Sequence, residues 1–583
     1  MRTLYESATR KRVKVLVPVF ALWFLVIIGR LAQFQILDHA ELKAEARQQT
    51  RDEVEIWARR GSILDRNGRI LATSLPAVSV YLQPAADETV EANIDKVRRL
   101  KTLLGLSDAE EAKAVKQIQN GGDFIYIKKR ADADVEDKVK ELGLDGVGFE
   151  RTTVRTYPQG GLAAHVLGWL NDEGKGGAGL EYAFNELLAG KPGSQVILRD
   201  AFGRRFETQT LREAQPGEDI TLTLDSTIQY RVEFELERGL REFGGTWGTV
   251  VIMGPDGEIL ALANRPAYDP NAGAPATTEL RRNIAVMSNF EPGSTFKIVT
   301  VAAAVESGQV AFNETFDCRE GSLRAGGTVI RDHKRLGVLS FPEVFSESSN
   351  VGTALVARRL GARTLYDEIR KFGFGEHTGV EFAGEEAGIV HPLESWNKNS
   401  SLEHVAIGYE VMATALQLLR AMNIYATRGW LVHPRIVSKP ETTERTAGLT
   451  PPRRVLDART TEEIISRIFT LVVEKGTGLP ARLDGYGIAG KTGTAQKNLG
   501  AGRGYSSTEH QASFVGFVPA EDPAFTMVVV IDSPRGELQY GGQVAAPIFR
   551  RIAEATLHYL RVPPRPRAGA GPVLVAPAAE DRP

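Results

Sequence analysis

The segment EPGSTFKIVTVA at residues 291–302 places a serine, Ser294, and a lysine, Lys297, at the start of an apolar run. Pro292 and Gly293 end a loop, so the apolar run predicts a buried helix whose first turn contains Ser294. Because residues three apart lie on one face of a helix, we expect the Ser294 hydroxyl and the Lys297 amine on the same side. This pair is the minimum equipment for a nucleophile that forms an acyl intermediate.

Lysine acts as a base only when its amine is neutral. Burial beside apolar side chains, together with a second cation, would lower the pKa of Lys297 towards that state. Lys491 is the candidate for the second cation. The amides and dipole at the helix start would also stabilise negative charge at Ser294. Alone the pattern is weak, since a serine that caps a helix and a solvated lysine give the same spacing.

A second polar group, Ser348-Ser349-Asn350, precedes an apolar helix predicted over residues 351–360. In isolation, Ser and Asn at a helix start indicate capping. Combined with the first motif, the group predicts that Ser348 relays a proton between Lys297, Lys491 and a leaving amine. Asn350 would then hold a peptide group of the substrate.

The third group, Lys491-Thr492-Gly493-Thr494, follows small residues in a predicted strand. Alternation puts Thr492 and Thr494 on one face of the strand and Lys491 on the other. Gly493 removes bulk where a substrate backbone would lie along the strand edge, and two hydroxyls in a cationic setting suit a terminal carboxylate. The predicted catalytic residues are Ser294, Lys297, Ser348, Asn350, Lys491, Thr492, Gly493 and Thr494, of which Asn350, Thr492 and Thr494 would bind substrate.

The same region satisfies a different pattern, because Gly485 to Thr492 has the spacing of a nucleotide-binding P-loop. Residues 528–532, an apolar strand ending in aspartate, resemble the magnesium-binding strand of such proteins. A P-loop, however, follows a buried apolar strand and opens a helix. Residues 481–486 are polar and Gly493 opposes an immediate helix, so nucleotide hydrolysis is kept only as a remote alternative.

The composition is that of a globular protein. The chain has 583 residues, 42% hydrophobic and 25% charged, which suggests about three or four domains. A formal net charge of −2 gives no electrostatic case for nucleic acid as a partner. The single cysteine, Cys318, excludes an internal disulfide framework and is interpreted as a small buried residue. The nine histidines lack metal-ligand spacing, so we expect neither a metal nor a cofactor.

The N-terminus differs from the rest of the chain. Residues 1–14 are basic, an apolar run extends over residues 15–29, and after Arg30 the pattern resumes over residues 31–37. The uninterrupted run is short for a bilayer, but Lys14 and Arg30 lie near its ends and their amines can reach the headgroups. We expect an uncleaved single-pass anchor in the inner cell membrane; a cleaved signal peptide and a buried core helix are the alternatives. The basic flank places residues 1–14 in the cytoplasm and the remainder in the periplasm or outside.

The order of predicted elements suggests how the chain is organised. Residues 38–58 are charged and predict a helical stalk, and Asn67-Gly68 predicts a hairpin turn. Residues 85–145 are mostly helical, and a helix is predicted from Gly179 to Leu188. Beyond Asp219 come strands, helices, more strands and a last helix, which predicts one sheet covered by helices. This last helix is placed at residues 547–559, and the chain after it is rich in Pro and Ala and expected to be disordered.

With these residues in place, the chain resembles a class B penicillin-binding protein from residue 10 to about residue 560. No glycosyltransferase domain fits after the anchor, which separates class B from class A. Residues 168–171 through 199–204 look more similar to the septal type than to the elongation type. Ile407-Gly408-Tyr409-Glu410 departs from the commoner Gly-Gln-Gly. Further matching segments are Arg60-Gly61, Asp65-Arg66, Arg155 with Tyr157-Pro158, His165-Val166-Leu167-Gly168, Gly179-Leu180-Glu181, Glu291-Pro292-Gly293, Phe372-Gly373-Phe374-Gly375 and Tyr540-Gly541-Gly542.

The resemblance implies a mixed α+β fold. A transpeptidase domain similar to β-lactamases, with an antiparallel sheet between helices, would follow an elongated α+β pedestal and one transmembrane helix. The implied divisions are a basic tail (1–14), the anchor (15–37), a non-catalytic pedestal for dimerisation or partner docking (38–215), the transpeptidase domain (216–562) and a disordered tail (563–583).

The resemblance also implies a D,D-transpeptidase that crosslinks peptidoglycan stem peptides through an acyl-enzyme on Ser294 and is a target of β-lactams. The amides of Ser294 and Thr494 would form its oxyanion hole. Its pedestal would dock a polytopic glycosyltransferase of the shape, elongation, division and sporulation type, alongside other division proteins. An elongation-type transpeptidase, a D,D-carboxypeptidase and a β-lactamase remain alternatives. An idle scaffold or β-lactam sensor is disfavoured, because all the named groups are intact.

Overall fold

The computed structural model describes residues 2–39, 43, 51–85, 88–199, 205–275, 277–438, 451–500 and 504–565. The described chain separates into two compact units, one containing residues Met1–Arg60 and Ala189–Gly217 and the other Gly61–Leu188 and Glu218–Pro583. Most of the C-terminal tail that the sequence predicts to be disordered, from residue 566 onward, lies outside the described residues.

The N-terminal helix α1 (Arg2–Ala32) continues into a π-helical turn, η1 (Gln33–Leu37). Many of the apolar side chains from Val15 onward, among them Leu22 and Trp23, are more than half exposed. Among the described residues, Lys14–Leu37 is the one helical segment long and apolar enough to cross a membrane. A helix of 24 residues spans about 36 Å, which exceeds the roughly 30 Å of a bilayer core. The predicted anchor falls within this segment.

The remainder of the first unit is a three-stranded antiparallel sheet in the order β1-β6-β7. Its strands are β1 (Arg51–Ile56), β6 (Gly193–Arg199) and β7 (Arg205–Arg212). The prediction of a helical stalk over residues 38–58 is therefore wrong at β1. Charge content misled it, because Val54 and Ile56 alternate with acidic residues and this period of two belongs to a strand.

The second unit begins with a sheet in which β3 pairs with both β4 and β5, and β2 joins β3 to β8. The Asn67-Gly68 turn is confirmed: Gly68 has a φ of 79°, and the Asp65 carboxylate accepts the amides of Asn67 and Arg69. The strands are β2 (Ile63–Leu64), β3 (Ile70–Leu82), β4 (Ile125–Asp132), β5 (Val147–Thr156) and β8 (Ile220–Thr221).

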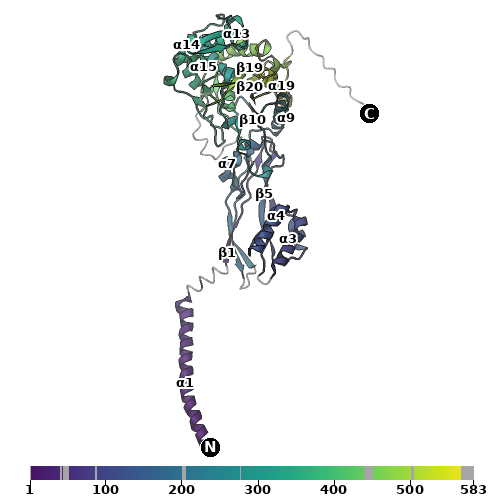
Figure 1. The fold of residues 1–583 in the computed structure, drawn as a ribbon, viewed down its shortest axis with the longest axis vertical. Helices are drawn as coiled ribbons and strands as arrows, with labels where there is room; N and C mark the ends of the chain where they lie inside the picture. The colour runs from purple at the N-terminus through teal and green to yellow at the C-terminus, as the bar shows by residue number, and fades with distance from the viewer. Residues whose placement is uncertain are drawn as a thin grey trace, which may run out of the picture. The chain divides into compact units, whose positions relative to one another are not determined.

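Helices α3 and α4 lie together beside β4 in this part of the unit (Figure 1). The expectation of mostly helix over residues 85–145 is right for these helices, but β4 was missed although Ile125 and Ile127 are buried at alternate positions. The single helix predicted from Gly179 to Leu188 is two helices, since Phe184 interrupts it. The helices are α3 (Val90–Leu104), α4 (Asp108–Gln119), α5 (Val135–Lys140), α6 (Ala164–Leu167), α7 (Gly179–Ala183) and α8 (Asn185–Ala189).

The larger part of the second unit is built on a five-stranded antiparallel sheet in the order β10-β9-β21-β20-β19. Val250 and Ile252 of β9 pack in one hydrophobic cluster with α9 and α19, whereas Val251 and Met253 pack in another with α12 and α16. The prediction of a sheet covered by helices is thus confirmed. The strands are β9 (Trp247–Met253), β10 (Ile259–Arg265), β19 (Ala489–Asn498), β20 (Tyr505–Val518) and β21 (Phe525–Asp532).

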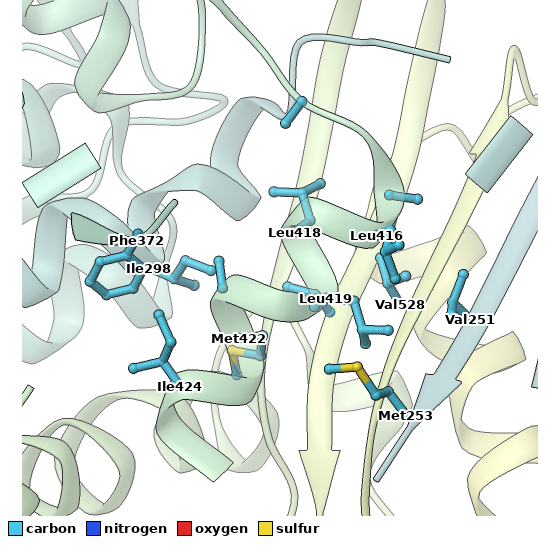
Figure 2. Packing of buried hydrophobic residues seen from close by; sticks show 14 of the residues in the cluster. Val251, Met253, Ile298, Phe372, Leu416, Leu418, Leu419, Met422, Ile424 and Val528 are labelled. Carbon is cyan, nitrogen blue, oxygen red and sulfur yellow. The ribbon is translucent and has the colours of Figure 1, made fainter. Parts of the chain in front are cut away.

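Helix α16 (Ala415–Ala426) packs between the sheet and α12 (Lys297–Glu306), and all of its residues are buried. Figure 2 shows Leu416 and Leu419 directed at Val528 and Val251 of the sheet, with Ile424 on the side of Ile298. Each fully buried leucine contributes roughly 2 kcal/mol of transfer free energy. This packing fixes the sheet against α12, the helix that follows Ser294.

The helices around α16 and the last helix complete the unit. The last helix begins at Gly541 rather than at Pro547, because Tyr540 and Gln543 form a capping box before the proline. The helices are α9 (Ser226–Phe243), α10 (Thr278–Arg281), α11 (Ile284–Met287), α12 (Lys297–Glu306), α13 (Phe341–Ser346), α14 (Asn350–Lys371), α15 (Ser401–Ala406), α17 (Ala458–Ile464), α18 (Thr470–Glu474) and α19 (Gly541–Tyr559).

Short strand pairs join these helices. They are β11 (Thr315–Cys318) with β14 (Gly337–Ser340), β12 (Ser322–Ala325) with β13 (Thr328–Arg331), β15 (Ile389–Val390) with β16 (Val411–Met412), and β17 (Trp430–Leu431) with β18 (Arg453–Arg454).

Candidate active site

Ser294 lies in the short 3-10 helix η3 (Gly293–Phe296), which runs directly into α12. The predicted helix start is therefore right, although its first turn is 3-10 rather than α-helical. Residues three apart are eclipsed in a 3-10 turn, so Ser294 and Lys297 lie one above the other. Ser294 is partly exposed and Lys297 is completely buried.

The Lys297 amine reaches the second motif. It lies 2.8 Å from the Ser348 carbonyl oxygen, 2.8 Å from Asn350 Oδ1 and 3.4 Å from Ser348 Oγ. Burial lowers its pKa from 10.5 to about 7, although the Asp332 carboxylate acts in the opposite direction. A substantial fraction of Lys297 is therefore neutral near neutral pH and able to accept a proton.

Ser348 connects the two lysines. Its hydroxyl lies 2.9 Å from the Lys491 amine, and burial together with the Lys297 charge lowers the pKa of Lys491 well below 10.5. The three motifs, distant in sequence, thus meet at one hydroxyl. Ser348 has a φ of 57°, a left-handed conformation that costs a non-glycine residue roughly 1–3 kcal/mol.

The capping role that the sequence suggested for the second motif falls on Ser349 alone. Ser349 is the N-cap of α14, and its hydroxyl accepts the Gly352 amide at 2.8 Å. The residues on either side, Ser348 and Asn350, are then free to turn towards the lysines. One triplet therefore combines a structural serine with two residues placed for chemistry.

Asp332 was not found by sequence reasoning. Its carboxylate accepts the Asn350 amide at 2.5 Å, the Val351 amide at 3.1 Å and the Ser349 hydroxyl at 2.8 Å. It thus fixes the start of α14, where the helix dipole favours negative charge. No spacing pattern links Asp332 to the second motif, because the hairpin β12–β13 and the turn after it bring the residue there.

The third motif lies on β19, which is paired on one side with β20 and forms the edge of the sheet. Thr492 and Thr494 face the start of α19: the Gly541 amide donates to Thr494 Oγ1 at 2.9 Å, and a Cβ on Gly542 would lie 3.6 Å from the Thr492 methyl group. Lys491 faces the other way, towards Ser348. The predicted alternation of side chains is thus present.

The surroundings of Thr492 favour an anion. Its hydroxyl lies 2.7 Å from that of Thr477 and 3.5 Å from the Lys491 amine, and the positive end of the α19 dipole is close to both threonines. Thr477 was also missed, since it belongs to a loop with no motif of its own. The hydroxyls, the amine and the helix start can together hold a carboxylate.

The open edge of β19 lies against the turn that carries Ser294. The Gln496 amide donates to the Tyr409 hydroxyl rather than to β20, so the amides at alternate residues, including that of Thr494, face the open edge. A Cβ on Gly293, whose φ is 54°, would lie 3.3 Å from the Thr494 carbonyl oxygen. Thr494 thus presents its amide on the side of the nucleophile turn.

The P-loop alternative is not favoured. Lys491 and Thr492 lie inside strand β19 and do not open a helix. Residues 528–532 form the C-terminal part of β21, and the Asp532 carboxylate is engaged by Lys497 and Thr246. The spacing of a P-loop is present without its strand–loop–helix geometry. Within the described residues, the structure has no cluster of three or more His, Cys, Asp or Glu side chains that could hold a metal.

Family models match almost the whole chain beyond the N-terminal helix. Residues 248–554 match the penicillin-binding protein transpeptidase domain, and residues 55–222 match the penicillin-binding protein dimerisation domain. The three motifs fall inside the first match, and the sheet of β2, β3, β4, β5 and β8 falls inside the second. The chain belongs to the class B penicillin-binding proteins.

Individual relatives agree over nearly their full length. A probable peptidoglycan D,D-transpeptidase, PenA of Neisseria gonorrhoeae, is 34% identical over 95% of this chain and 93% of its own. The peptidoglycan D,D-transpeptidase FtsI of Escherichia coli is 31% identical over 94% and 91%. A crystal structure of penicillin-binding protein 3 from Mycobacterium tuberculosis, complexed with aztreonam, superimposes with a TM-score of 0.66 at 30% identity and covers 88% of this chain and 98% of that one.

Proposed function

We propose that this protein is a peptidoglycan D,D-transpeptidase that crosslinks stem peptides, and that it acts in the septal wall during cell division. One observation carries the proposal: two buried lysines meet at the Ser348 hydroxyl, and one of them, Lys297, lies one turn after the partly exposed Ser294. A buried amine with a pKa of about 7 is suited to general-base catalysis. The names of PenA and FtsI supply the substrate class.

The reaction would begin with proton transfer from Ser294 to the neutral Lys297 amine. The serine oxygen attacks the carbonyl carbon of the penultimate D-alanine, and the oxyanion that forms accepts hydrogen bonds from the amides of Ser294 and Thr494. Collapse of this intermediate breaks the peptide bond, and Ser348 delivers a proton from Lys297 to the departing nitrogen of the terminal D-alanine. An ester on Ser294 remains.

In the second half, an amine from a neighbouring stem peptide attacks the ester. Lys297 receives the proton that this amine loses and returns it to the Ser294 oxygen as the ester bond breaks. The product is a new amide crosslink and the free enzyme. A β-lactam would stop the cycle at the ester, because its opened ring stays attached and blocks the incoming amine.

Substrate binding would use the other predicted residues. Thr492 and Thr494 would hold the terminal carboxylate, next to Lys491 and the start of α19. Asn350 donates one amide hydrogen to the Arg331 carbonyl oxygen at 3.0 Å, which leaves the second for a peptide carbonyl of the substrate. Gly493 is required here by packing inside the protein, since a Cβ would lie 2.3 Å from Ser513 Oγ and 2.8 Å from the Thr295 methyl group.

We also propose the arrangement of the whole chain. Residues 15–37 would anchor it in the inner membrane, with residues 1–14 cytoplasmic and the transpeptidase domain, 216–562, periplasmic or extracytoplasmic. Residues 38–215 would serve as the pedestal that docks a polytopic glycosyltransferase and other division proteins. The apolar α1 helix and the names of the relatives support the anchor and the septal role. An elongation role is the alternative.

A transfer assay tests the function. The purified protein receives a stem-peptide thioester and a D-amino acid, and the yields of transfer product and hydrolysed acid are compared. The proposal expects transfer to predominate, whereas hydrolysis alone would indicate a carboxypeptidase. In parallel, a fluorescent penicillin should label the wild type and fail to label Ser294→Ala. Labelling that persists in this variant would refute Ser294 as the nucleophile.

A further inference from the structure

The loop of residues 407–410 is held against the nucleophile turn, the residues just before Ser294, by hydrogen bonds. The Gly293 amide donates to the Gly408 carbonyl oxygen at 3.0 Å, and the Glu410 amide donates to Glu291 Oε1 at 3.0 Å. Gly408 has a φ of 87°, and a Cβ there would lie 2.0 Å from the Gly293 oxygen, so only glycine fits. The position of this loop is thus set by the residues just before Ser294.

Tyr409 is held on several sides within this loop. Its amide donates to the His404 carbonyl oxygen at 2.9 Å, and its ring packs edge-to-face with Tyr505 at 5.1 Å between centroids. Tyr505 in turn donates its hydroxyl to Glu291 Oε1 at 2.9 Å. The Glu410 carboxylate is fixed by the Ser401 hydroxyl and by His404 Nδ1 at 2.9 Å. The Tyr409 ring therefore has a defined place beside the active site.

The Tyr409 hydroxyl occupies a position where a substrate backbone could otherwise pair. It accepts the amide of Gln496 at 3.3 Å on the open edge of β19. Residues two apart in a strand present their amides on the same edge, so Gln496 is the next such position after Thr494. A peptide added along this edge would meet Thr494 first and Gln496 second.

We propose that Tyr409 is a specificity-determining residue that ends the pairing of the acyl-donor peptide with β19 after Thr494. The proposal rests on the transpeptidase function above. The Gln496 amide is already satisfied by the Tyr409 hydroxyl. The part of the stem peptide that precedes the two terminal D-alanines must therefore leave the strand at Tyr409, and extra donor backbone gains no ladder hydrogen bond.

Donors of two lengths measure this effect. One is N-acetyl-D-Ala-D-Ala, and the other is an N-acetylated pentapeptide that ends in the same two residues; a D-amino acid is the acceptor. The quantity of interest is kcat/KM for transfer from the long donor divided by kcat/KM for the short one. Tyr409→Ala opens the edge at Gln496, and this ratio should rise by about twofold to tenfold, the effect of one added hydrogen bond. Tyr505→Phe is the matched control, since it removes the hydroxyl that donates to Glu291 and keeps the ring that packs against Tyr409, and its ratio should stay within twofold of wild type.

A second measurement does not depend on turnover. Tyr409→Phe keeps the ring and removes only the hydroxyl, so hydrogen exchange at the Gln496 amide should accelerate in the free enzyme, whereas Tyr505→Phe should leave it unchanged. An unchanged or lowered donor ratio in Tyr409→Ala, an equal rise in Tyr505→Phe, or unaltered exchange in Tyr409→Phe would each overturn the proposal. If the wild type transfers neither donor, the transpeptidase function fails as well. Transfer with an unmoved ratio refutes only the role of Tyr409.

Discussion

Arg155 and Lys297 are two of the buried basic side chains in the described part of the chain, and their surroundings act on the charge in opposite ways. Arg155, near the end of β5, has a side chain 4% exposed and forms an ion pair with Glu181 at 2.6 Å. It also donates to the Gly61 carbonyl oxygen at 2.7 Å. Lys297 is equally buried, but its amine contacts only carbonyl, amide and hydroxyl oxygens, those of Ser348, Ser349 and Asn350.

The difference separates a structural charge from a functional one. A buried cation next to a carboxylate stays charged, because the pair compensates for the lost hydration. A buried amine that has only neutral acceptors loses hydration without compensation, and its pKa falls. The nearest carboxylate to Lys297, Asp332, is engaged by the amides of α14 instead. The fold therefore keeps Lys297 as a proton acceptor and Arg155 as a fixed ion.

The largest effect is expected from removing the functional cation. Lys297→Met takes away the general base, and the rate of acylation by a fluorescent penicillin should fall by about 10³-fold. The free energy of unfolding should change by less than about 2 kcal/mol, because the lost hydrogen bonds are offset by removing a poorly hydrated amine. Stopped-flow acylation and urea unfolding measure the two quantities. A large loss of stability with little loss of rate would reverse the assignment.

The structural cation should show the reverse behaviour. Arg155→Met removes the cation that is paired with the buried Glu181 carboxylate, so the free energy of unfolding should fall by about 3–5 kcal/mol. The acylation rate of the folded fraction should stay within about twofold of wild type, since Arg155 contacts no residue of the three motifs. Urea unfolding combined with active-site titration checks this. A matched control is Arg151→Met on the same strand, which is 87% exposed and should cost less than about 1 kcal/mol.

The role of Lys297 could be predicted from the sequence, whereas much of the structure around it could not. The spacing of Ser294 and Lys297 on one turn follows from local helix geometry, and the alternation of Thr492 and Thr494 follows from strand geometry.

The roles of Ser349 as helix cap and of Ser348 as a residue in the left-handed conformation could not be predicted, because Ser-Ser-Asn alone does not say which serine caps the helix. Asp332 and Thr477 arrive by tertiary folding from segments without a motif. The error at residues 51–56 had another cause: charge was weighed above the alternation of Val54 and Ile56.

The pKa of Lys297 should appear directly in the pH dependence of the acylation rate. The amine is neutral above a pKa of about 7 and protonated below it. Acylation by a penicillin should therefore be constant at higher pH and fall about tenfold for each unit of pH below 7. The same shift affects folding: the unfolded chain binds the proton up to about pH 10.5, so the contribution of Lys297 to stability rises between pH 7 and 10.5. A rate that is flat from pH 5 to pH 9 would contradict a neutral-lysine base.

The smallest expected effect concerns Asp332, whose negative charge acts on the Lys297 amine. Its carboxylate raises the pKa of Lys297 through space while it holds the start of α14. Asp332→Asn retains an oxygen for the Asn350 amide and removes the charge, so the acid limb of the acylation profile should move to lower pH by less than about one unit. Asp317→Asn, which removes an exposed carboxylate paired with Arg319, is the control and should leave the limb in place. If the acid limb stays fixed or moves to higher pH in Asp332→Asn, burial alone determines the pKa of Lys297. The position of a carboxylate would then not explain why Lys297 and Arg155 differ.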